Sequence, residues 1–351
     1  MKQTLPYLFV IATLPVLLGS CKGTRTVTMD SMRPAEITFP SYVNTLVIVD
    51  RSKFEKKAVN IIEGVLTGEL PGEDEAGVQA LVNSFRQQLT YSPRFQTKVA
   101  TERLAGNSLT TTFPQQLSWG KVSRLCRKYG AQAVVAVEIF DTDFIITNGK
   151  RKVRKTVVVD SVKQEIEVDE YYAEGIGSIA IGIRLYDPKA KNIVDQQLLK
   201  RNNTWRASGT TLQDALTQLI AKGEATRRLS QNVGSNYAYK VAPMPIRITR
   251  SFNGKSRKAP ALEQGSRYAD VGKWSEAIRI WKRGIASAPT KQGGDLSYNI
   301  AIAYEVIGEL EEAKNWAQKS YVQFGNKDAK GYVSLIRQRL YEEQLAERQL
   351  K

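Results

Sequence analysis

The sequence predicts an α+β fold: a mixed, sandwich-like α/β domain over residues 41–250, followed by an all-helical domain of helical hairpins over residues 259–349. Three observations lead to this fold class. Apolar runs of strand length occur in the first region, alternating runs separated by turn residues follow them, and two later segments repeat one spacing of small and aromatic residues. Residues 1–20 and 21–40 precede both domains and differ from them in composition.

The N-terminus has the three parts of a secretory signal peptide. Lys2 is followed by an apolar stretch that contains two prolines and ends in Gly19, Ser20 and Cys21. A bilayer-spanning helix needs about 20 apolar residues, so cleavage is the better interpretation. Leu18-Gly19-Ser20-Cys21 resembles the lipobox of bacterial lipoproteins, which implies that Cys21 becomes an acylated N-terminus and that residues 21–40 form a tether.

The residues after Cys21 bear on location. Gram-negative lipoproteins that stay in the inner membrane carry an aspartate there, and surface-exported Bacteroidota lipoproteins carry an acidic run. This chain has Lys-Gly-Thr-Arg. The resemblance therefore implies the periplasmic face of the outer membrane, with the acyl chains on Cys21 as the membrane contact.

Charge and residue content exclude several classes of function. The net charge is +16, and no histidine is present. In an envelope compartment, a basic chain is expected to meet lipid head groups, anionic glycans or acidic proteins rather than nucleic acid. Without histidine, histidine-dependent catalysis and histidine metal sites are excluded, and we expect no cofactor besides the lipid on Cys21. Cys126 has no partner once Cys21 is acylated and is expected to pack in the core.

The α/β domain is placed by its apolar pattern. Residues 43–52 and 131–140 are nearly continuous apolar runs, as expected of strands covered on both faces. A helical stripe begins at Val78 and ends before Pro93, and a second helix follows the capping residue Ser118.

Turn signals then predict hairpins and a long helix. Asn148-Gly149 predicts a tight turn, and Asp187-Pro188-Lys189 predicts a second one. Apolar residues at helical spacing from Leu212 predict one long helix that stops at Gly234.

The helical domain shows an internal repeat. One spacing of glycine, aromatic and alanine positions occurs twice, first in Gly265, Tyr268, Gly272, Trp274, Ala277, Trp281, Gly284 and Pro289, then in Ala301, Tyr304, Gly308, Leu310, Ala313, Ala317, Ser320 and Gly325. It resembles the tetratricopeptide repeat, in which small residues let antiparallel helices approach closely. Two repeats and a capping helix are expected.

Nearly the whole chain resembles a family of Bacteroidota outer-membrane lipoproteins with an N-terminal α/β domain and C-terminal tetratricopeptide repeats. The lipobox, the junction at 237–252 and the repeat segments carry this resemblance. It implies location and architecture, and no activity.

Three functional hypotheses follow. The leading one is a noncatalytic adaptor that binds an envelope protein through the concave side of the repeats, at Tyr298, Asn299, Ile302 and Glu305. Tetratricopeptide arrays usually hold peptides on this side, although two repeats can also merely buttress the α/β domain. The second is a binder of anionic lipid or glycan through a basic hairpin tip, at Lys150, Arg151, Lys152, Arg154 and Lys155.

The third hypothesis is a carboxylate-dependent glycan hydrolase. Asp141 and Asp143 share a strand face, and further carboxylates follow at Asp160, Glu165, Glu167, Asp169 and Glu170. Such a pair does acid-base chemistry only if one carboxyl is desolvated, and solvated strand faces explain the pattern more simply. No motif specifies catalysis, so no catalytic residue is assigned.

Overall fold

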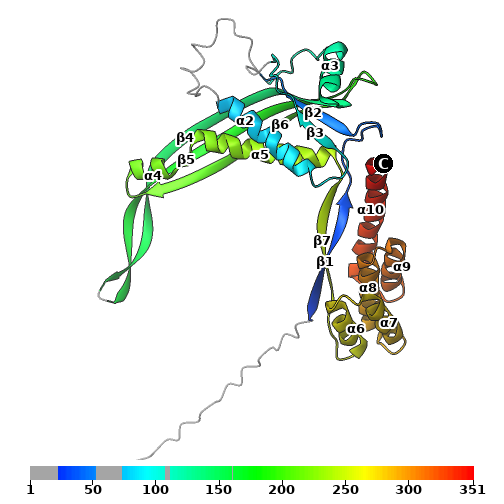
Figure 1. Cartoon of the computed structure of the whole chain (residues 1–351). Coiled ribbons are helices and arrows are strands. Elements are labelled where there is room, and N and C mark those ends of the chain that lie inside the picture. Colours follow the sequence, from blue (N-terminus) through cyan, green and yellow to red (C-terminus); the bar gives the residue numbers. More distant parts are fainter. Residues whose placement is uncertain (1–22, 53–72, 107–110, 160) are drawn as a thin grey trace, which may run out of the picture. The chain divides into compact units, whose positions relative to one another are not determined.

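The computed structural model describes residues 23–52, 73–106, 111–159 and 161–351 (Figure 1). The signal peptide, Cys21 and Asp160 lie outside the described residues. The chain divides into two compact units. One unit takes in the chain up to Asp30 together with Arg247–Tyr341, and the other takes in Ser31–Ile246 with Glu342–Lys351. A mixed α/β region is thus followed by an all-helical region, which confirms this part of the predicted fold class.

The α/β unit is built on a five-stranded sheet with the order β3-β2-β4-β5-β6. Its strands are β2 (Thr45–Asp50), β3 (Gln96–Val99), β4 (Ala133–Val159), β5 (Val162–Asp187) and β6 (Asn192–Gly209). β3, β2 and β4 are parallel, whereas β4, β5 and β6 are antiparallel neighbours. The helices are α2 (Glu73–Leu89), α3 (Trp119–Tyr129), α4 (Leu212–Gln218) and α5 (Lys222–Val241).

Both faces of the central strands are buried, which explains their continuous apolar sequence. Leu46 and Ile48 of β2 pack with α2 and α5 on one face. Val47 and Val49 point the opposite way and pack with α3 on the other. The predicted cap of α3 is confirmed, because the Ser118 side chain accepts a hydrogen bond from the Lys121 backbone N–H at 3.4 Å. The predicted turn at Asp187-Pro188-Lys189 is also confirmed and joins β5 to β6.

The predicted turn at Asn148-Gly149 is wrong, because β4 continues through both residues to Val159. Gly149 pairs directly with Tyr172 of β5. A Cβ atom at residue 149 would lie 2.6 Å from the Tyr172 hydroxyl oxygen. The glycine therefore makes room for a tyrosine across the strand pair, and the hairpin turns twelve residues later, at Ser161, which has a φ of 66°.

The long helix predicted from Leu212 to Gly234 is also wrong. Leu219 and Ala221 are extended and separate α4, which lies along β6, from α5, which packs on α2. Gly234 does not end α5, which runs on to Val241. A Cβ at Gly234 would lie 2.3 Å from the Leu81 carbonyl oxygen, so this glycine is required where α5 crosses α2.

The helical unit contains α6 (Pro260–Asp270), α7 (Trp274–Ile285), α8 (Thr290–Val306) and α9 (Leu310–Val322), followed by α10 (Lys327–Leu350), whose last turns belong to the α/β unit. Its core is centred on Trp281, Ile300 and Ile336. The predicted tether at 21–40 is wrong in part, because β1 (Thr24–Arg33) pairs with β7 (Met244–Asn253) in a two-stranded sheet. β1 alternates polar and apolar residues only weakly, so its sequence did not indicate a strand.

Candidate functional site

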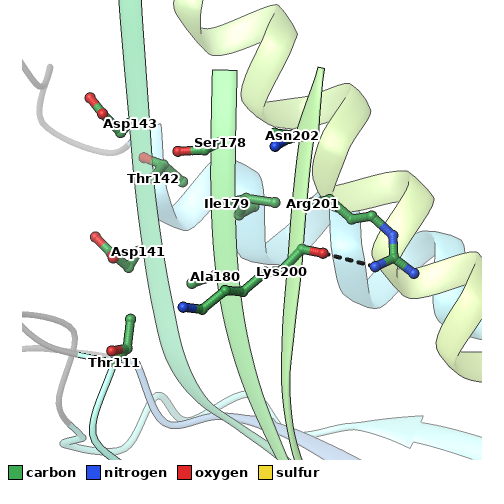
Figure 2. A pocket seen from close by; sticks show the side chains of 10 residues that line it. All are labelled: Thr111, Asp141, Thr142, Asp143, Ser178, Ile179, Ala180, Lys200, Arg201 and Asn202. Atoms are coloured by element: carbon green, nitrogen blue, oxygen red, sulfur yellow. Dashed lines mark hydrogen bonds between the residues drawn. The ribbon is translucent and has the colours of Figure 1, made fainter. Parts of the chain in front are cut away.

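The groove around Asp141 and Asp143 lies on the open face of β4, β5 and β6 (Figure 2). It has a volume of about 500 Å³ and is lined by Thr111, Asp141, Thr142, Asp143, Ser178, Ile179, Ala180, Lys200, Arg201 and Asn202. Both carboxylates are exposed. Partial removal of water and the negative charge of Asp143 raise the pKa of Asp141, while Lys200 opposes this rise. The paired carboxylates thus share a face as predicted, but in an open groove rather than a desolvated pocket.

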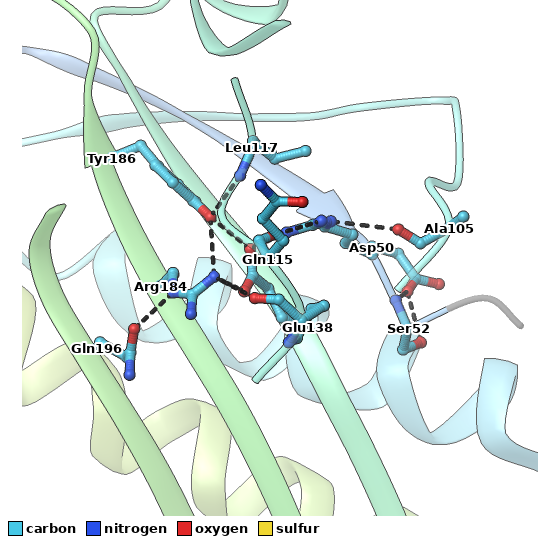
Figure 3. Close-up of polar contacts among 11 residues, drawn as sticks. Asp50, Ser52, Ala105, Gln115, Leu117, Glu138, Arg184, Tyr186 and Gln196 are labelled. Carbon is cyan, nitrogen blue, oxygen red and sulfur yellow. Dashed lines mark hydrogen bonds and ion pairs between the residues drawn. The ribbon is translucent and has the colours of Figure 1, made fainter. Parts of the chain in front are cut away.

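The α/β unit contains a buried polar cluster that sequence reasoning missed (Figure 3). Glu138 is fully buried and lies at a register shift in the pairing of β4 with β5. Its two carboxylate oxygens accept from Arg51 Nη1 at 2.8 Å and from Arg184 Nη1 at 2.7 Å. The Tyr186 hydroxyl donates to the same carboxylate at 2.6 Å. Burial, followed by this hydrogen bond, raises the pKa of Tyr186.

This cluster fixes the segment that precedes α3. Arg51 Nη2 donates to the Gln115 carbonyl oxygen at 2.6 Å, and Arg184 Nη1 donates to the Pro114 carbonyl oxygen at 2.9 Å. The Leu117 backbone N–H donates to the Tyr186 hydroxyl. The four side chains of the cluster therefore serve structure, since each one is committed to another or to the backbone.

A crevice lies at the carboxyl ends of β2 and β3, the edge where open α/β sheets usually bind ligands. Its volume is about 330 Å³. Arg103 contacts both Asp50, at 2.5 Å, and Glu75, at 2.8 Å. Arg103 is therefore already neutralised by two carboxylates of the same chain.

The five predicted cationic residues are not at a hairpin tip. Lys150, Arg151, Lys152, Arg154 and Lys155 lie along β4, opposite an acidic stretch of β5. Four ion pairs join the strands: Lys150–Asp169 at 2.8 Å, Arg151–Glu170 at 2.7 Å, Lys152–Glu167 at 3.6 Å and Lys155–Glu170 at 3.8 Å. These pairs lower the pKa of Asp169 and of Glu170. The positive charge that the sequence predicted for a tip is thus largely balanced across the strands.

The same stretch is a two-stranded ribbon, which we call the β4–β5 ribbon: residues 150–159 of β4 and 162–170 of β5. β6 pairs with β5 only from Tyr171 onward, so among the described residues no third strand accompanies the ribbon. Figure 1 shows it projecting beyond α4. Isolated two-stranded hairpins are marginally stable in water, which makes a protruding ribbon an unusual feature to retain without a partner.

The β4–β5 ribbon is amphipathic. Alternation along β4 and its register with β5 put Val153 beside Val168, and Ile166 beside Lys155, on one face. The opposite face carries Lys152 with Asp169 and Arg154 with Glu167. Ile166 is 40% exposed. Ile145 and Ile176 lie on the same face at 53% and 38% exposure, but the Arg151–Glu170 ion pair stands between them and Val153. The alternating sequence of residues 162–170 was the signal that could have found it.

The predicted partner-binding residues of the helical unit are not on an open surface. Asn299, Ile302 and Glu305 are buried, and Tyr298 is half-buried against Tyr332. The Asn299 side chain accepts from the Asn253 backbone N–H at 2.9 Å and donates to the Asn253 carbonyl oxygen at 2.7 Å. The prediction is wrong because β7 occupies the side of α8 that was expected to be free.

Glu305 is held by three partners within the helical unit. Arg250 contacts it at 2.8 and 2.9 Å, Arg339 contacts it at 2.8 Å, and the Tyr332 hydroxyl donates to it. Burial, then the charge of Glu305, raises the pKa of Tyr332. Glu305 therefore joins β7 and α10 to α8.

The expected burial of Cys126 is confirmed, and burial followed by the charge of Asp187 raises the pKa of its thiol to about 11. Within the described ranges, no group of three or more cysteine, aspartate or glutamate side chains is placed to hold a metal ion. No helix in the same ranges has the length and apolar character to cross a membrane.

The fold and the site together define a mixed α/β domain with a projecting ribbon, followed by a helical domain. Residues 43–252 match DUF8603, a domain of unknown function, and residues 263–347 match DUF6340, also a domain of unknown function. The first match spans more than half of the chain, which therefore belongs to the DUF8603 family. No curated protein matches the chain.

Solved structures show only a distant likeness. A PelC dodecamer from Paraburkholderia phytofirmans is 12% identical, with a TM-score of 0.26 over 60% of this chain and 96% of that one. A putative neuraminyllactose-binding hemagglutinin homolog from Helicobacter pylori is 9% identical, with a TM-score of 0.27 over 59% of this chain and 95% of that one. At these TM-scores, neither structure guides the assignment of function.

Proposed function

We propose that the chain is a noncatalytic adaptor of the cell envelope, anchored through acylated Cys21 at the periplasmic face of the outer membrane. The lipobox and the residues that follow it support the anchor and the location. The adaptor role is supported most by one observation: no third strand of the described residues accompanies the β4–β5 ribbon, and it exposes Ile166 beside the half-buried Val153 and Val168.

The partner's chemistry follows from the apolar face of the ribbon. Val153, Ile166 and Val168 form a narrow apolar strip, with Lys155 beside Ile166 and the Arg151–Glu170 ion pair at one end. Such a strip fits an apolar protein surface with polar edges, which would cover it and leave the charged face in water. Anionic lipid or glycan is a weaker alternative, because four of the five cations of β4 are already paired with carboxylates.

A glycan hydrolase that acts in the groove around Asp141 and Asp143 is also a weaker hypothesis than the adaptor. Asp141 and Asp143 are exposed, whereas a general acid of a glycosidase needs a desolvated carboxyl.

We assign the helical unit to the tetratricopeptide type. A Cβ at Gly265 would lie 2.2 Å from Trp281 Nε1, so the small residue allows α6 and α7 to approach closely, and Gly272 and Gly308 both turn with positive φ. In this proposal the repeats form a scaffold whose side next to β7 is already occupied.

Replacing Ile166 with lysine tests the proposal. The lysine places a positive charge in the apolar strip, and Ile166 is exposed. We therefore expect recovery of the envelope partner to fall by at least about tenfold while thermal stability is retained. Thr156→Lys is the matched control, because it adds the same residue to the opposite face one row away. Affinity purification from native membranes with quantified recovery measures both.

Two results would contradict the proposal. Equal recovery with both variants would show that the strip binds no protein. If the Ile166→Lys variant lost binding to anionic vesicles while its recovery of proteins stayed unchanged, the lipid hypothesis would be favoured instead.

A further inference from the structure

The start of β1 is the point where the helical unit meets the proposed anchor. The Gly254 backbone N–H donates to the Gly23 carbonyl oxygen at 2.7 Å, so the chain is fixed to this unit from Gly23 onward. Cys21 precedes Gly23 by two residues, which span at most about 7 Å. The headgroup layer on each side of a bilayer is roughly 5–7 Å thick. An acylated Cys21 therefore holds Gly23 at the membrane surface.

A basic loop lies against Gly23. It joins β7 to α6 and carries Lys255, Arg257 and Lys258, which are all exposed. A Cβ at Gly23 would lie 3.3 Å from Lys255 Cε, so this lysine passes directly over the point where the chain enters β1. Within the described ranges, none of the three cations has an ion-pair partner. In this they differ from the cations of the β4–β5 ribbon, most of which are paired across the strands.

The turn between α6 and α7 is held near the start of β1 as well. Arg25 of β1 forms an ion pair with Asp270, the last residue of α6. After Asp270, Val271 is 69% exposed and Lys273 is also exposed. Residues 254–274 contain five cationic side chains and two carboxylates, and the carboxylate of Asp270 is already neutralised by Arg25. The exposed charge beside the start of β1 is therefore mainly positive.

We propose that this surface docks on anionic lipid head groups; we call it the anchor surface, and it consists of Lys255, Arg257, Lys258, Val271 and Lys273. The inference rests on the proposed acylation of Cys21 and adds an orientation, in which the basic loop and the α6–α7 turn face the bilayer. A lipid surface is the occupant because the acyl chains keep it within reach of these cations. Each lysine or arginine near an anionic membrane strengthens binding roughly fivefold, and the exposed valine adds an apolar contact.

Lysine footprinting of the unsubstituted, acylated chain tests the proposal. The chain is purified from native membranes and placed in vesicles of phosphatidylcholine alone or in vesicles that also contain phosphatidylglycerol. A water-soluble amine reagent then modifies exposed lysines, and mass spectrometry gives the rate at each one. We expect Lys255 and Lys258 to react at least about fivefold more slowly in the anionic vesicles, and added salt to restore their rates. Lys327 and Lys330 of α10 are exposed internal controls and should react equally in both.

The mass of the N-terminal peptide in the same samples separates failure of the anchor from failure of the anchor surface. A Cys21 without acyl chains would overturn both. An acylated Cys21 with equal rates at Lys255 in the two kinds of vesicle would overturn the anchor surface alone, because a tether without recognition of charge gives that result.

A charge-reversal variant gives a second readout. Lys255→Glu, Arg257→Glu and Lys258→Glu together replace attraction by repulsion, which should lift the α6–α7 turn from the lipid. We expect the reaction rate of Lys273 in the anionic vesicles to rise at least about threefold. The three positions are exposed, so the thermal unfolding curve should stay unchanged.

The matched control replaces Lys327, Lys330 and Arg337, three exposed cations of α10, with glutamate. It changes the net charge by the same amount and should leave Lys273 protected. Equal rates at Lys273 in the two variants would show that the basic loop does not hold this surface on the membrane, and would overturn the proposal.

Discussion

Replacing Glu138 with alanine should lower the free energy of unfolding of the α/β unit by about 3–5 kcal/mol. The variant leaves Arg51 and Arg184, both nearly buried, without the carboxylate that neutralises them. It also removes the acceptor of the Tyr186 hydroxyl. Urea unfolding followed by tryptophan fluorescence measures the loss, because Trp119 packs against Tyr186 at 6.0 Å between ring centroids.

The control for Glu138→Ala is Glu102→Ala. Glu102 is partly exposed and pairs with Lys128 at 2.9 Å, and hydrogen bonds from Lys128 and Tyr129 lower its pKa to about 2. Exposed pairs contribute at most about 1 kcal/mol. Equal losses of unfolding free energy from the two variants would show that the buried cluster stabilises the unit no more than an exposed ion pair does.

Replacing Glu305 with alanine should destabilise the helical unit by a similar amount, about 3–5 kcal/mol. Arg250 and Arg339 would remain largely buried without their shared carboxylate, and the Tyr332 hydroxyl would lose its acceptor. Thermal unfolding followed by far-ultraviolet circular dichroism measures this change.

Glu312→Ala, at an exposed position of α9, is the comparison variant and should stay within about 0.5 kcal/mol of the unsubstituted chain. If Glu305 belonged to an open peptide groove, as the repeat pattern predicted, its replacement would leave stability intact. An unchanged unfolding curve would therefore favour the original prediction over the buried role described above.

Local signals predicted the elements whose sequence has a single physical explanation. The continuous apolar run at 43–52 indicated a strand covered on both faces, and Ser118 indicated a helix start, because few other arrangements bury or cap these residues. Asn148-Gly149 failed as a turn signal, since a glycine beneath the Tyr172 ring has the same sequence signature as one in a turn.

The sites depended on long-range contacts that periodicity does not report. The helical spacing of Tyr298, Asn299 and Ile302 places them on α8 but does not reveal that β7 lies against that side. Glu138 carried a usable signal, because a carboxylate inside a buried apolar strand requires buried partners. Only the register of the sheet shows which arginines are the buried partners of Glu138.

The central claim is that the apolar face of the β4–β5 ribbon contacts an envelope protein. A photo-crosslinking amino acid at position 166, compared with one at position 156, tests it in living cells. We expect one discrete protein adduct from position 166 that is absent from position 156. Adducts of equal yield from both faces, adducts to lipid alone, or no adduct at position 166 would contradict the account.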